Sequence, residues 1–223
     1  MRKIILLLLI TTASLLTGCA TPNYVTKQAA YPLMYQQHPL SILVVPAINH
    51  STAADAPELY STTIATPLAE AGYYVLPLPI TNMLLQQQGV VDGEQLEKVD
   101  ATKFQGLFGA DAILFVTINQ WDTNYYITGG NVTVGAAFRL VSTKDNEELW
   151  HYSQTIVYDT SGNSGGGLLA AIISTAISTA TTDYVPIART VNGIVVNTLP
   201  AGKYNPHYDK DGAVTILEQK QVN

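Results

Sequence analysis

Short apolar runs alternate with longer polar segments along the chain, and this order predicts strands separated by helices. Residues 40–48 and 112–121 are apolar runs rich in β-branched side chains. Such runs are typical of strands that are buried on both faces of an α/β sheet. Residues 73–79 predict a further strand between them. The first half of the chain therefore indicates a sheet with connecting helices.

Helices are expected between these strands. Residues 55–71 repeat apolar side chains at helical spacing, and Asp55 and Glu58 form a capping-box pattern at the start of this segment. A glycine directly after it fits a helix end. Residues 80–88 predict a short helix, and residues 92–111 predict one or two more.

The second half of the chain predicts a long antiparallel hairpin followed by helical structure. Residues 131–143 and 147–159 are the expected strands, with turn-forming residues between them. Residues 168–199 carry an apolar stripe at helical spacing, which Asp183 and Pro186 break into two helices. The fold class expected is α/β, a single domain with a mixed sheet, a long antiparallel hairpin and packed helices.

The first residues change the picture, because they predict export. Residues 1–18 have a basic start, an apolar run and a small-residue end, the order of a secretory signal peptide. Leu16, Thr17 and Gly18 precede Cys19 in the pattern of a bacterial lipobox. The prediction is that signal peptidase recognises the first three, and that Cys19 receives acyl chains such as palmitate. Two or more acyl chains give stable membrane attachment.

The chain is then expected to divide into four parts. Residues 1–18 are the signal peptide and residues 19–38 a lipidated N-terminal tether, broken by prolines. Residues 39–200 form the α/β domain, and residues 201–223 a polar C-terminal tail. Tyrosines in the tether are candidates to dock on the domain, and residues 213–217 are a candidate edge strand.

Composition excludes several functional classes. The chain has a formal net charge of −6 and no run of basic residues, so nucleic acid is not expected as a partner. Its single cysteine allows no disulfide within the chain. The four histidines are not spaced as metal ligands, so neither a metal nor another cofactor is expected. Only 13% of the residues are charged, which hints at a surface covered by a partner.

A glycine-rich stretch, residues 159–186, permits three interpretations. Gly165, Gly166 and Gly167 lack the following lysine of a phosphate-binding loop, so phosphate binding is excluded. The absence of charge from Ser161 to Thr182 leaves membrane insertion as an alternative. The preferred interpretation is a flexible loop that leads into a core helix, because the apolar residues form a stripe.

One polar cluster is a candidate for chemistry. Asn49, His50, Ser51 and Asp55 follow the first strand, and functional groups often lie at the carboxyl ends of parallel strands. The simpler interpretation is turn and helix-cap chemistry, and it is preferred. A periplasmic hydrolase is retained as the alternative.

Three segments carry a resemblance to a known family: residues 67–77, 107–118 and 136–150. They resemble a domain-of-unknown-function family of Gram-negative lipoproteins. The helix ending in Gly-Ala-Asp before an apolar strand, followed by a hairpin, is also similar to the TolB amino-terminal domain and to curli-secretion lipoproteins. This resemblance implies a domain that binds other proteins and is not an enzyme.

The predicted function is that of a lipid-anchored outer-membrane lipoprotein that faces the periplasm. It is expected to act as a non-enzymatic docking or assembly component of an envelope secretion or surface-maintenance complex. Its partners would be the membrane, through the lipid on Cys19, and copies of itself or other envelope lipoproteins. Tyr125 and Tyr126, the hairpin and Gly165–Gly167 are candidate contacts. A membrane-inserting oligomeric channel component is the alternative.

Overall fold

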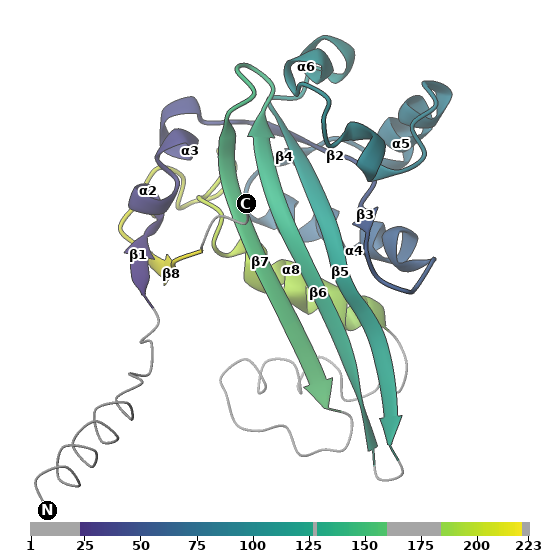
Figure 1. Ribbon diagram of the computed structural model, residues 1–223. Helices are drawn as coiled ribbons and strands as arrows, with labels where there is room; N and C mark the ends of the chain where they lie inside the picture. Colours follow the sequence, from purple (N-terminus) through teal and green to yellow (C-terminus); the bar gives the residue numbers. More distant parts are fainter. Residues whose placement is uncertain (1–22, 127–128, 160–183, 220–223) are drawn as a thin grey trace, which may run out of the picture.

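The computed structural model describes residues 23–126, 129–159 and 184–219. Its main sheet has the strand order β4-β2-β5-β6-β7, and β3 also pairs with β5 (Figure 1). The strands are β2 (Ser41–Val44), β3 (Ile48–Asn49), β4 (Tyr74–Val75), β5 (Ala112–Tyr126), β6 (Gly129–Ser142) and β7 (Glu148–Asp159). β4, β2, β3 and β5 pair in parallel, whereas β5, β6 and β7 are antiparallel. The mixed α/β fold predicted from the sequence is confirmed.

The first predicted strand is present in two pieces. Pro46 lies between β2 and β3 and has no N–H to donate to a neighbouring strand. Both pieces nevertheless pair with β5, and the Val45 N–H donates to the Leu114 carbonyl at 3.3 Å. The proline therefore interrupts the strand without moving it out of the sheet.

Two helices cover one face of the sheet, α4 (Ala56–Glu70) and α8 (Tyr184–Val196), which lie behind the strands in Figure 1. The predicted stripe of α4 is confirmed, because Tyr60, Ile64 and Leu68 are all buried. The predicted capping box is wrong: Asp55 occupies the N-cap position, but its side chain caps no backbone N–H.

A second, smaller core lies on the opposite face of β2 and the first part of β5. The helices α5 (Leu78–Gln87), η1 (Gly93–Leu96) and α6 (Thr102–Phe108) cover it. Their buried side chains Leu85, Leu96 and Phe104 pack in the same cluster as residues of the two strands. Farther along β5, β6 and β7, no described helix covers this face (Figure 1).

β5 and β6 are longer than the sequence indicated, whereas β7 matches its expected strand to within one residue. β5 and β6 pair from Ala112↔Ser142 to Tyr126↔Gly129, with one irregularity between Ile118 and Gln120. The predicted β6–β7 hairpin is confirmed. Its turn uses Asn146, whose φ of 62° lies in the left-handed region that asparagine tolerates.

The terminal segments differ from the predicted tether and tail within the described residues. Residues 24–37 form β1 (Tyr24–Thr26), α2 (Lys27–Ala30) and α3 (Pro32–Gln37). The candidate strand in the tail is present as β8 (Thr215–Leu217), and it pairs antiparallel with β1. Tyr31 is buried and donates its hydroxyl to the His151 carbonyl at 2.8 Å. The expected docking of tether tyrosines on the domain is thus observed for Tyr31.

A buried ion pair holds these two termini together. The Lys27 ammonium lies 3.0 Å from Asp211 Oδ2, and each side chain is only 8% exposed. Lys27 also donates to the Leu199 carbonyl at 2.8 Å, while Asp211 accepts from the Tyr35 hydroxyl and the Ala201 N–H. Because a buried charge is costly when unpaired, this satisfied network fixes β1 against the domain.

Candidate docking surface

The polar cluster after the first strand is made of turn contacts. The Asn49 Oδ1 accepts hydrogen bonds from the Ser51 N–H at 3.0 Å and the Ser51 hydroxyl at 2.7 Å, and Asn49 Nδ2 donates to the Ala53 carbonyl. His50 lies 3.7 Å from Glu94 Oε1, and both side chains are largely exposed. No hydrogen bond joins His50 to Ser51 in this described loop, so the cluster fits turn chemistry better than catalysis.

Several predicted site residues lie outside the described residues. These are Leu16, Thr17, Gly18 and Cys19 at the start of the chain, and Gly165, Gly166 and Gly167. Tyr125 and Tyr126 end β5, where their backbones pair with Gly130 and Gly129. Their roles stay predictions.

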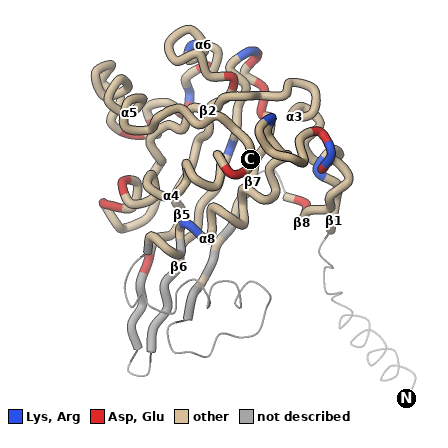
Figure 2. Tube along the Cα trace, turned by 180° about the vertical axis from the view of Figure 1, so that it is seen from behind, with Lys and Arg blue, Asp and Glu red and all other residues tan. Residues whose placement is uncertain are grey.

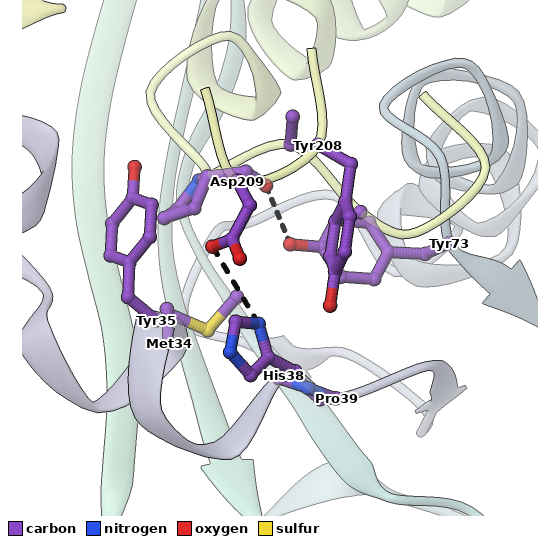
Figure 3. A pocket seen from close by; sticks show the side chains of 10 residues that line it. Met34, Tyr35, His38, Pro39, Tyr73, Tyr208 and Asp209 are labelled. Atoms are coloured by element: carbon purple, nitrogen blue, oxygen red, sulfur yellow. Dashed lines mark hydrogen bonds and ion pairs between the residues drawn. The ribbon is translucent and has the colours of Figure 1, made fainter. Parts of the chain in front are cut away.

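The small pocket in Figure 3 is structural. It lies where α3 meets the loop after Pro200, and Tyr35, His38, Tyr73 and Asp209 line it. Its volume of about 10 Å³ is room for about one water molecule. His38 Nδ1 lies 3.9 Å from Asp209 Oδ1 across it. Its contacts join the N-terminal helices to the C-terminal loop.

Metal and membrane-spanning elements were sought in the described part of the chain. Residues 23–126, 129–159 and 184–219 bring together no group of three His, Asp or Glu side chains that could hold a metal ion. Over the same residues, no helix combines the length and the hydropathy needed to cross a bilayer.

An apolar surface is exposed on α5. Ile80, Met83 and Leu84 project outward from α5 at spacings of three and four residues, so they share one helix face. We call these three residues the α5 surface. Each of the three side chains is between 40% and 53% exposed. Contiguous exposed apolar side chains are typical of interaction sites.

A groove of about 770 Å³ lies on another side of the same helix, where Leu78 and Asn82 of α5 and the exposed Tyr74 of β4 line it. One wall is the small-residue side of α4, including Ala65 and Ala69, and the other is the β4–α5 connection with its prolines. β4 is an edge strand: Tyr74 and Leu76 donate to β2, so the N–H and C=O of Val75 point to the open side. An open edge beside an apolar groove can accept an extended segment.

The α5 surface was missed by the sequence reasoning, although the sequence contains a signal for it. No charged residue occurs from Ala71 to Val91. In Figure 2 the tube of α5 has the colour of uncharged residues, while charged positions are scattered over other parts of the domain. An uncharged segment that is nevertheless exposed indicates such an apolar surface.

The fold and this surface define a class: a single mixed α/β domain that carries an exposed apolar face. The chain belongs to the family described as Putative lipoprotein GNA1162-like, whose model matches residues 29–205. The "Putative lipoprotein NMB1124/NMB1162" of Neisseria meningitidis serogroup B is 35% identical over 148 residues, which are 66% of this chain and 68% of that protein. The resemblance to a lipoprotein family is therefore confirmed.

The chain is similar to two solved structures. The crystal structure of lipoprotein GNA1162 from Neisseria meningitidis aligns with a TM-score of 0.52 and 37% identity, over 63% of this chain and 96% of that one. The PelC dodecamer from Paraburkholderia phytofirmans aligns with a TM-score of 0.49 and 13% identity, over 82% and 98% of the two chains.

Proposed function

We propose that this protein is a lipid-anchored, non-enzymatic docking component of the outer membrane that faces the periplasm. The lipid is carried by Cys19, and membership of a lipoprotein family supports this attachment. The α5 surface carries the docking. Its exposed aliphatic side chains lie on a helix that also lines an uncharged groove with an open strand edge, a combination suited to another protein.

The partner we propose for the α5 surface is a second copy of this chain. Copies that carry the same anchor on the same short linker are held at the same height above the membrane. They are also concentrated in two dimensions, which raises their effective concentration. An uncharged face does not repel its own copy, although the chain has a net charge of −6.

Site-specific photo-crosslinking in cells tests this function. A photoreactive residue at Leu84 should crosslink to protein, whereas the same residue at exposed Tyr204, outside the α5 surface, should not. Mass spectrometry of the Leu84 product identifies the partner. Crosslinks to identical copies support self-assembly. Crosslinks to another envelope lipoprotein would show that the partner is that protein and not a second copy, and would still support the docking role. Equal crosslinking at both positions, or none at Leu84, would contradict docking through this surface.

A further inference from the structure

A second group of exposed apolar side chains lies where the N-terminal chain enters the fold. Tyr24 and Leu217 face each other across the β1–β8 pair, and Val214 directly precedes β8. These three side chains are between 40% and 64% exposed. In Figure 1, β1 and β8 lie on the opposite side of the domain from α5. We call these three residues the β1–β8 edge.

The β1–β8 pair has two different faces. Val25 and Ile216 are paired with each other and turn toward the main core, where Ile216 is buried. Because side chains alternate along a strand, Tyr24 and Leu217 point away from the core. The outer face thus carries the apolar pair Tyr24 and Leu217 beside the threonine pair Thr26 and Thr215.

The distance to the anchor limits where this face can lie. Tyr24 follows Cys19 by only five residues. Five residues span at most about 18 Å, even when fully extended. The linker cannot lengthen beyond β1 without breaking the buried Lys27–Asp211 pair, because Lys27 directly follows the strand. A lipid on Cys19 therefore keeps the β1–β8 edge close to the bilayer.

We propose that the β1–β8 edge rests on the headgroup region of the bilayer, with Tyr24 and Leu217 in contact with lipid. This inference rests on the lipid anchor of the proposed function. Tyrosine is favoured at this depth because its ring is apolar and its hydroxyl remains hydrated. The contact orients the domain, so that the α5 surface on the opposite side stays accessible to a partner.

The lipid that fits this edge is zwitterionic. Glu218 is the only charged residue among residues 23–26 and 212–218, and Asn23 donates a hydrogen bond to it. These segments contain no basic side chain, and Lys27 beyond them is paired with Asp211, while exposed Lys210 lines the same surface pocket as Val214. The contact made by Tyr24 and Leu217 themselves is apolar, so salt should weaken it little.

Depth-dependent fluorescence quenching tests the contact. The lipidated full chain carrying Leu217→Trp is reconstituted in phosphatidylcholine vesicles with or without brominated acyl chains. Leu217 is far from Cys19 along the chain, so its proximity to lipid reports docking of the ribbon and not only the tether. The matched control is Leu84→Trp, at the same 40% exposure. Both native tryptophans, Trp121 and Trp150, are buried and give an equal background.

The expected result is a loss of Leu217→Trp emission with brominated lipid and no loss for Leu84→Trp. Val214→Trp serves as a second reporter if Leu217→Trp does not fold. The protein could float with the vesicles while the tryptophan on the β1–β8 edge and Leu84→Trp are quenched equally, or while neither is quenched. Either result would overturn the membrane contact, but the lipid anchor would stand. If the lipidated chain does not float with vesicles at all, both the anchor and the contact are overturned.

Discussion

At the scale of single residues, the Lys27–Asp211 pair is the most sensitive position. Lys27→Met leaves the Asp211 carboxylate buried at 8% exposure without its cation. We expect the free energy of unfolding to fall by about 3–5 kcal/mol, the usual cost of removing one partner from a buried pair. Urea denaturation measures this loss, with the exposed Lys98→Met as the control. An equal effect of both substitutions would show that the pair is not what stabilises the terminal segments.

His151 gives a prediction about pH at the same scale. The hydrogen bond that joins its Nδ1 to Glu148 at 2.8 Å raises the pKa of His151 above its ordinary value, while burial opposes this rise. The protonated form is therefore favoured by folding. Its stabilisation is fully present below the unfolded pKa of about 6.5 and is lost as the pH rises through the folded pKa. In Glu148→Gln, NMR titration should show a lower His151 midpoint; an unchanged midpoint would contradict the assignment.

At the scale of elements, α4 and α8 are joined by a buried polar contact. Asn192 of α8 accepts a hydrogen bond from the Tyr60 hydroxyl and donates to Thr63 Oγ1 at 2.8 Å, both on α4. Asn192→Leu leaves the buried Tyr60 hydroxyl without its acceptor, which costs about 1–3 kcal/mol, while the Thr63 hydroxyl keeps its hydrogen bond to the Tyr60 carbonyl. Hydrogen exchange should accelerate in α8 more than in β5, which lies in the sheet. Uniform acceleration in both elements would contradict a local role, and Tyr60→Phe, which removes one bond, should have the smaller effect.

The same helices explain how far the sequence could predict this fold. Apolar spacing identified α4 correctly, because its buried face is apolar. It placed Val191 and Ile194 on the apolar stripe of α8, and Val191 is indeed fully buried, whereas Ile194 is only partly buried. The other fully buried residues of this helix are Ala188, Val195 and the polar Asn192. Hydropathy places asparagine outside, so a buried amide shifts the predicted face. The sequence suggested a strand at residues 213–217 but could not identify β1 as its partner. The two strands are distant in sequence, and their outer positions follow no apolar pattern.

The candidate site was harder to predict for a related reason. Helical spacing indicates a helix at α5, but this helix has apolar residues on two sides, Leu85 toward the core and Met83 toward solvent. Periodicity cannot tell which side is buried. The sequence pointed to the cluster around His50 as a candidate for chemistry because of its residue types, yet its contacts are those of a turn. For a protein without an evident catalytic group, surface exposure was the missing information.

At the scale of the whole molecule, our proposals assign separate tasks to the two exposed apolar regions. In the proposed arrangement the β1–β8 edge contacts the membrane, and the α5 surface contacts a partner. Introducing charge at Met83→Glu with Leu84→Glu should therefore abolish crosslinked assemblies in cells and leave membrane attachment intact. Because both side chains are already exposed, the free energy of unfolding should change by no more than about 0.5 kcal/mol each. Leu107→Glu on α6, also highly exposed, is the control that should retain assembly. Intact assemblies in the double variant would move the docking role away from α5, whereas loss of membrane attachment would show that the two regions are not independent.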